Sequence, residues 1–232
     1  MKKLYTLLLA GLFSLSAFSQ SSNGIIQSRV QKLDAMLDDA IANQKVPGLV
    51  AMVLKDGELV YHEAKGYADV ASKTMMEKDH IFRIASQTKA ITATAVMILW
   101  EEGKFRLDDP ISNYIPEFKN PQVLAGFRYS DTTFSTRPAD KEITIRHLLT
   151  HTSGLGYGVI DGDERMKMIY HKAGVVDVFT TENISIEESV KRLAKLPLHH
   201  DPGTKYTYSE GLDVLGYFVE IISGQPFDVF LK

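Results

Sequence analysis

Two short β-rich runs joined by a tight turn restrict the fold of this chain more than any other feature. Residues 49–54 and 59–61 consist mainly of aliphatic and aromatic side chains, and they flank the sequence Lys55-Asp56-Gly57-Glu58. An Asp-Gly pair between two such runs predicts an antiparallel hairpin. Two strands do not form a stable sheet by themselves, so we expect other parts of the protein to complete it.

The chain is predicted to be helical before the hairpin and mostly helical after it. Apolar residues recur at helical spacing in residues 28–42 and 212–224. Residues 86–102 are apolar and rich in alanine, and Ser185 and Glu188 form a capping box for a helix over residues 185–195. We also predict a short helix over residues 144–150, a helical piece after Asp108-Asp109-Pro110, and a further helix that begins near Pro226. Residues 120–141 are polar and rich in turn formers, and we interpret them as a long loop that shapes a binding site.

The predicted fold class is therefore α+β, a helical region beside an antiparallel sheet. Because the hairpin supplies only two strands, we expect the last strands of that sheet to lie outside these 232 residues. The chain contains no cysteine, which excludes disulfides, thiolate metal sites and a cysteine nucleophile. Its net charge of −3 gives no electrostatic reason to expect nucleic acid as a partner.

The first nineteen residues have the pattern of a secretory signal. Lys2 and Lys3 precede a mostly apolar run, and small residues follow at its end, which predicts cleavage after Ser19. The run is too short for a membrane helix, and no cysteine follows it to carry a lipid anchor. We expect residues 1–19 to be a signal peptide, residues 20–232 to form one domain, and the product to be periplasmic or secreted, without a stable membrane anchor.

Ser86 and Lys89 are the first candidates for catalysis. Their three-residue spacing on a predicted helix places both side chains on one face. A hydroxyl beside an amine pairs a nucleophile with a base, and the helix N-terminus favours a developing oxyanion. A lysine so close to an apolar helix body also needs a structural or functional reason.

Three other clusters are weighed as sites. Tyr208 lies in a turn before the last long helix, where its phenol can reach a cleft; the alternative is a core tyrosine. His147 and His151 have a spacing that can hold zinc, but no third ligand is evident, so we favour a structural turn. The run His199-His200-Asp201 is interpreted as an ordinary loop, and we predict no metal and no cofactor.

Four ordered blocks together resemble the serine β-lactamase-related family. The blocks are Phe82-Arg-Ile-Ala-Ser86-Gln-Thr-Lys89-Ala, Glu102-Gly-Lys-Phe-Arg-Leu107-Asp108-Asp109-Pro110, Ile145-Arg-His-Leu-Leu-Thr-His-Thr-Ser-Gly-Leu155 and Pro202-Gly-Thr-Lys-Tyr-Thr-Tyr208-Ser. This family includes class C β-lactamases, D-alanyl-D-alanine carboxypeptidases and S-x-x-K esterases. The resemblance implies a β-lactamase/transpeptidase-like fold and a serine hydrolase that acts through an acyl-enzyme on an ester, amide, peptide or β-lactam.

The resemblance also implies roles for individual residues. Ser86 corresponds to the acylated nucleophile, Lys89 to the lysine that helps remove its proton, and Tyr208 to the base or proton relay. Gln87 and Glu210 are assigned to substrate binding. The backbone N–H of Ser86 would form half of the oxyanion hole.

Two departures from the family pattern affect the expected activity. Glu210 stands where the family usually has Asn, and an ionised Glu can only accept hydrogen bonds, which disfavours β-lactam or peptide substrates. The third family element, Lys/His-x-Gly, which would supply the second half of the oxyanion hole, does not follow Tyr208, so we expect weak or no activity from the chain as given. The alternative is a non-catalytic module that binds penicillin or cell-wall fragments.

The identity of the base is left open by the sequence. For Lys89 to act as a base near neutral pH, its pKa must fall by about 3 units, or roughly 4 kcal/mol. If Lys89 instead stays charged, it favours the ionised phenol of Tyr208, and Tyr208 is the base.

Overall fold

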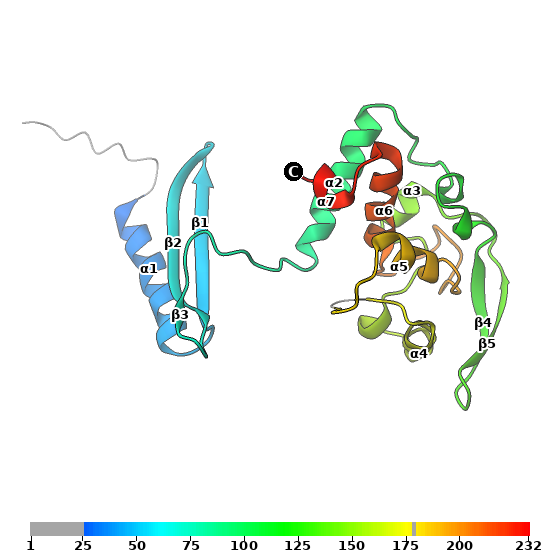
Figure 1. Cartoon of the computed structure of the whole chain (residues 1–232), viewed down its shortest axis with the longest axis horizontal. Helices are drawn as coiled ribbons and strands as arrows, with labels where there is room; N and C mark the ends of the chain where they lie inside the picture. The colour runs from blue at the N-terminus through cyan, green and yellow to red at the C-terminus, as the bar shows by residue number, and fades with distance from the viewer. Residues whose placement is uncertain (1–25, 178–179) are drawn as a thin grey trace, which may run out of the picture. The chain divides into compact units, whose positions relative to one another are not determined.

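The computed structural model describes residues 26–177 and 180–232. They form two compact units that divide between Arg83 and Ile84, and we describe each unit by itself. The first unit contains α1 and β1–β3, and the second contains α2–α7 and the β4–β5 hairpin (Figure 1). The predicted signal peptide, residues 1–19, lies outside the described residues. No helix in the described part of the chain has the length and apolar character that a membrane crossing requires.

The first unit is built on the predicted hairpin. Strand β1 (Gly48–Lys55) pairs antiparallel with β2 (Glu58–Asp69). Asp56 and Gly57 both have positive φ, 52° and 81°, as a type I′ turn requires. The hairpin is thus confirmed, but β2 is longer than predicted and also pairs with β3 (Thr74–Met75), a third strand that the sequence analysis missed.

Helix α1 (Gln27–Ala42) confirms the helix predicted over residues 28–42. Two polar contacts join it to β2. The Tyr61 hydroxyl donates a hydrogen bond of 2.6 Å to Asp34 Oδ1, and Lys65 forms an ion pair of 2.6 Å with Asp38. Burial and the nearby Asp34 carboxylate raise the pKa of Tyr61 to about 12, so this phenol stays a donor at neutral pH.

The second unit packs around α6 (Gly211–Ser223), which confirms the last predicted long helix. Helix α6 contacts α2 (Gln87–Glu101), α3 (Ile145–Leu149), α5 (Ile186–Leu193) and α7 (Phe227–Phe230), all of which were also predicted. Phe218 is fully buried and meets Phe105 and Tyr114 edge-on at about 5 Å. Helices α2 and α6 pack against each other in this core. Helix α2 begins directly after Ser86, and α6 begins shortly after Tyr208.

Helix α2 is buried on one face only. Thr92, Ala95, Val96 and Leu99 are buried, a spacing that forms one side of a helix. Ile91, Ile98 and Trp100 on the remaining surface are 43–46% exposed. The apolar, alanine-rich helix predicted to begin at Ser86 is therefore buried along one side, while its other side is exposed.

Residues 120–141 contain a β-hairpin, so their prediction as a loop is wrong. Strand β4 (Gln122–Arg128) pairs antiparallel with β5 (Thr133–Pro138). On its other side, β4 forms backbone hydrogen bonds with Leu198, from Leu124 N to Leu198 O (2.9 Å) and from Leu198 N to Gln122 O (2.7 Å). Since β5 is exposed along its whole length, no apolar alternation marks it in the sequence, and backbone pairing defines it.

Short helices complete the second unit. They are the 3-10 helices η1 (Ile111–Asn113), η2 (Pro116–Phe118) and η3 (Gly158–Ile160), together with the α-helix α4 (Glu164–Ala173). Helix α4 was not predicted. It ends at Gly174, which adopts the left-handed conformation that glycine accepts most readily. Figure 1 shows α4 and α5 in the same unit as α3 and α6.

Candidate active site

The chain turns sharply into α2 at Ser86. Ala85 has a φ of 44°, a conformation that is uncommon for residues other than glycine, and Ser86 is the N-cap of the helix. The Ser86 side chain is exposed. In the described part of the chain no group accepts a hydrogen bond from its backbone N–H, which leaves this donor available to a substrate oxygen at the helix N-terminus.

The hydroxyl of Ser86 meets the phenol of Tyr208. Ser86 Oγ lies 2.7 Å from the Tyr208 hydroxyl, although the two residues are 122 positions apart. The loop that carries Tyr208 is fixed on both sides by His151: Thr207 N–H donates to the His151 carbonyl (2.8 Å), and Ser209 N–H donates to His151 Nδ1 (3.2 Å). The structure therefore brings the serine and tyrosine hydroxyls into direct contact, and either of them can donate the hydrogen bond.

Lys89 completes the cluster from one helical turn further on. Its Nζ donates a hydrogen bond of 3.1 Å to the hydroxyl of Tyr157. The same Nζ lies 4.8 Å from the centroid of the Tyr157 ring and 5.2 Å from that of the Tyr208 ring. Both distances are within the range of a cation–π interaction, so two tyrosines hold one ammonium group beside Ser86.

The electrostatics of the cluster keep Lys89 charged. Burial by itself lowers the pKa of Lys89, but the hydrogen bond to Tyr157 and the negative charge of Asp213 outweigh it, and the pKa lies above its usual value. Of the two alternatives left by the sequence, the structure thus favours the second, in which Lys89 remains an ammonium ion. The proton of Ser86 then has Tyr208 as its nearest acceptor.

Two further groups, Tyr157 and Asp213, shape this cluster, and neither was predicted from the sequence. Tyr157 is buried and lies in the glycine-rich run that follows His151, and an aromatic residue fixed among glycines was the signal that could have identified it. Asp213 lies in the first turn of α6, and its negative charge raises the pKa of Lys89. The Asp213 side chain is open to solvent, yet the surrounding protein atoms desolvate its carboxyl and raise its pKa.

Glu210 and Gln87, predicted to bind substrate, lie in different environments. Gln87 is exposed in the first turn of α2. Glu210 is only 3% exposed, and its Oε1 has no hydrogen-bond partner in the described part of the chain. Burial, and then the carboxylates of Asp213 and Asp177, raise the pKa of Glu210 to about 9. The expectation of an ionised Glu210 is therefore wrong, because at neutral pH this group is a carboxylic acid with an O–H to donate.

The histidines considered as metal ligands take part in local hydrogen bonds. His147 Nδ1 accepts from Thr144 N–H (3.2 Å) in the N-cap of α3, and burial lowers the pKa of His147. His151 Nδ1 binds the segment that carries Tyr208, as described above. One group in the first unit, Glu77, Asp79 and His80, has potential ligand atoms within 4.8 Å of one another. His80 Nδ1 there already accepts the Glu77 N–H at 2.8 Å.

Comparison with known proteins places this geometry in a family. Residues 33–232 match the Beta-lactamase family. Esterase EstB of Burkholderia gladioli is 38% identical over 199 residues, which cover 86% of this chain and 47% of that protein. Protein flp of Staphylococcus aureus is 25% identical over 202 residues, 87% of this chain and 35% of that protein. The chain thus spans less than half the length of these relatives.

Solved structures agree with the sequence matches. The structure described as EstCE1, a hydrolase with promiscuous acyltransferase activity, has a TM-score of 0.72 at 29% identity, over 88% of this chain and 50% of that one. The penicillin-binding protein homologue from Pyrococcus abyssi has a TM-score of 0.62 at 28% identity, over 88% of this chain and 41% of that one. The expected mixture of helices and antiparallel sheet is confirmed. The chain, with Ser86, Lys89 and Tyr208 joined in one cluster, belongs to the beta-lactamase family.

Proposed function

We propose that this protein is an exported serine hydrolase in which Ser86 is acylated by a small ester or amide. The observation that carries the proposal is the 2.7 Å contact between Ser86 Oγ and the Tyr208 hydroxyl, with the Lys89 ammonium over the Tyr208 ring. The names of EstB, an esterase, and EstCE1, a hydrolase with promiscuous acyltransferase activity, support an ester as the first substrate class to test. The sequence of residues 1–19 supports export.

The cluster suggests a specific order of proton transfers. Tyr208, in its phenolate form, takes the proton of Ser86 as Oγ attacks the acyl carbonyl carbon, and the Lys89 ammonium stabilises the phenolate before the transfer. The carbonyl oxygen becomes an oxyanion, to which the free N–H of Ser86 can donate. As the intermediate collapses, the Tyr208 hydroxyl returns its proton to the departing alcohol or amine. Water then attacks the acyl-Ser86 ester by the same route and releases the acid.

Covalent labelling tests the proposal directly. The purified chain is incubated with a fluorophosphonate or with p-nitrophenyl acetate, and the modified residue is located by mass spectrometry. We expect labelling on Ser86 and none in Ser86→Ala. If Ser86 remains unmodified in the folded protein, the hydrolase proposal is wrong. Saturable binding of penicillin that is unchanged in Ser86→Ala would then select the non-catalytic alternative.

A further inference from the structure

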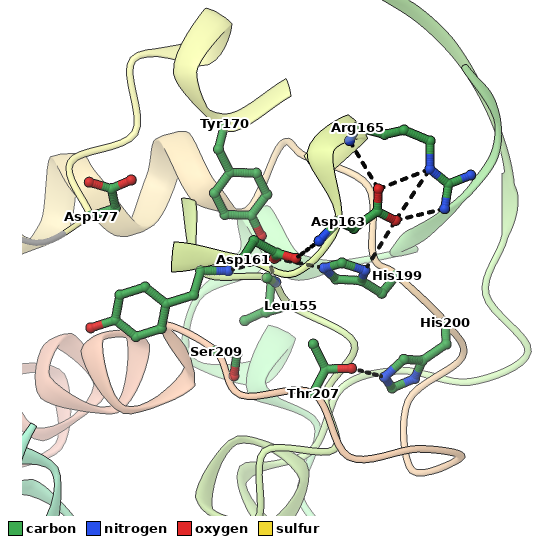
Figure 2. A network of polar contacts seen from close by, with 12 residues as sticks. Leu155, Asp161, Asp163, Arg165, Tyr170, Asp177, His199, His200, Thr207 and Ser209 are labelled. Atoms are coloured by element: carbon green, nitrogen blue, oxygen red, sulfur yellow. Dashed lines mark hydrogen bonds and ion pairs between the residues drawn. The ribbon is translucent and has the colours of Figure 1, made fainter. Parts of the chain in front are cut away.

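A buried carboxylate lies behind the active-site cluster, on the backbone side of Tyr157. Asp161 is 8% exposed, and its Oδ2 accepts hydrogen bonds from Tyr157 N–H (3.0 Å) and from His199 Nε2 (2.8 Å). Its Oδ1 accepts from Asp163 N–H (2.8 Å). Figure 2 shows Asp161 and His199 facing each other, with Asp163 and Arg165 beside them.

The charge state of Asp161 fixes the direction of these bonds. Burial raises the pKa of Asp161, but the hydrogen bonds from His199 and from the two backbone N–H groups outweigh it and hold the pKa below its usual value. An ionised carboxylate only accepts hydrogen bonds. His199 must therefore carry a proton on Nε2, and Asp161 receives three donors at once.

The backbone around Tyr157 has little freedom. Gly156 N–H donates to the Tyr170 hydroxyl (2.8 Å), and Glu210 N–H donates to the Gly156 carbonyl (3.0 Å). A Cβ on Gly156 would lie 2.5 Å from Asp161 Oδ2 and 3.0 Å from His199 Nε2, so only glycine fits. The Tyr157 backbone is thus held by polar groups from several separate segments of the chain.

The other side of His199 is also fixed. Its backbone N–H donates to the Gly154 carbonyl (2.7 Å), and its Nδ1 lies 3.9 Å from Asp163 Oδ2. Asp163 is paired in turn with Arg165 at 2.7 Å. The charged or titratable groups around Asp161 include His199, Asp163, Arg165, Tyr170 and the protonated Glu210. None of these groups forms a hydrogen bond with Ser86 or Lys89 in the described part of the chain.

We infer that Asp161 and His199 are positioning residues for the hydrolase chemistry. They hold the Tyr157 backbone so that its phenol binds Lys89 Nζ, and they act on Ser86 only through Tyr157 and Lys89. The inference rests on the proposed function for its catalytic meaning, but the predicted link between Asp161 and Lys89 does not require turnover. It is therefore testable by a direct titration of Lys89.

The first test follows the Lys89 ammonium by NMR of protein labelled at the lysine 13Cε, with Lys89→Met identifying the signal. Because the Tyr157 hydroxyl raises the pKa of Lys89, we expect Tyr157→Phe to lower it. Asp161→Asn should also lower the pKa of Lys89 in the otherwise unmodified protein, but it should cause no further change in that pKa when Tyr157→Phe is already present. An equal shift in both backgrounds would show a direct charge effect and overturn the inference.

Matched variants separate positioning from general destabilisation. Asp131 is the control, because its carboxylate also accepts a backbone N–H, that of Thr133 (3.1 Å), but lies in the β4–β5 turn. Asp131→Asn should leave the pKa of Lys89 unchanged. His199→Gln keeps an N–H that can reach Asp161 and should preserve the Lys89 titration, whereas His199→Ala should lower the pKa. If Asp161→Asn does not fold, as judged by circular dichroism, this His199 pair decides the question.

The second test measures the rate of fluorophosphonate labelling of Ser86. We expect Asp161→Asn to slow labelling by about tenfold in the otherwise unmodified protein, the effect of one misplaced hydrogen bond, but by less than about twofold in the Tyr157→Phe background. Equal slowing in both backgrounds would contradict a role through Tyr157. If no variant is labelled at all, the proposed function fails, while the Lys89 titration still decides whether Asp161 positions Tyr157.

Discussion

The ring of Tyr157 stacks on the ring of Tyr208, with centroids 5.3 Å apart and planes that differ by 2°. One ring belongs to the glycine-rich turn after α3 and the other to the loop before α6. Lys89 Nζ lies within 5.2 Å of both ring centroids. The stacking therefore orients the Tyr208 ring, whose hydroxyl contacts Ser86. It also places both aromatic rings in cation–π contact with the Lys89 ammonium.

Substitutions of Tyr157 separate the stack from the hydrogen bond. Tyr157→Phe keeps the ring but removes the hydroxyl that accepts the hydrogen bond from Lys89 Nζ, so we expect acylation of Ser86 to slow by about tenfold. Tyr157→Ala removes the stacked ring as well and should slow it further. The measurement is the rate of ester hydrolysis or labelling. Equal rates for the two variants would show that the ring contributes nothing beyond its hydroxyl.

Tyr208 and Tyr206 form a matched pair for the role of the phenol. Tyr208→Phe removes the group that touches Ser86 Oγ, and loss of a general base predicts a reduction in acylation of about a hundredfold or more. Tyr206 is 68% exposed and contacts His151 edge-on, so Tyr206→Phe should leave the rate within about twofold, as surface changes usually do. Rapid single-turnover measurements with a chromogenic ester check both. A fully active Tyr208→Phe would assign the base elsewhere.

Glu210 predicts a pH dependence of stability. The ordinary pKa of a glutamate carboxyl is 4.5, but the environment of Glu210 raises its pKa to about 9 in the folded protein. The carboxyl therefore stays neutral up to about pH 9 when the protein is folded. Between these values the folded state binds one proton more than the unfolded state, so stability falls as pH rises, with a slope of up to about 1.4 kcal/mol per pH unit. Glu210→Gln should remove this slope and stabilise the protein at alkaline pH.

Urea unfolding at a series of pH values measures the effect of Glu210. Glu101→Gln, at an exposed carboxyl at the end of α2, is the control and should retain the slope. A pH profile of Glu210→Gln that runs parallel to that of the unmodified protein would mean that Glu210 is ionised when folded.

The positive φ of Ala85 limits which side chains fit at the position before Ser86. With φ at 44°, Ala85 tolerates replacement by glycine, while a β-branched side chain clashes with its own backbone. We expect Ala85→Val to destabilise the protein by about 1–3 kcal/mol and to slow labelling of Ser86, and Ala85→Gly to fold normally. Thermal unfolding and labelling rates of the two variants provide the comparison. A fully stable Ala85→Val would argue against the strained turn.

The sequence alone determined the local elements and the residue types of the site. The Asp56-Gly57 turn needs positive φ at two positions, the helical stripes of α1 and α6 are set by spacing, and Ser185 caps α5 by accepting the Glu188 N–H (3.1 Å). Each of these depends on interactions between residues that are close in the chain. Ser86 and Lys89 belong to this group too, because one helical turn relates them.

Tertiary structure decided everything that depends on distant segments. Strand β5 has no apolar face to reveal it, and it exists through pairing with β4, which in turn pairs with Leu198. Tyr157 and Tyr208, which contact Lys89, lie 68 and about 120 positions further along the chain. The groups that surround Lys89 and Glu210 in the folded chain keep the first charged and the second protonated. A pKa is a property of an environment, and only the folded chain supplies one.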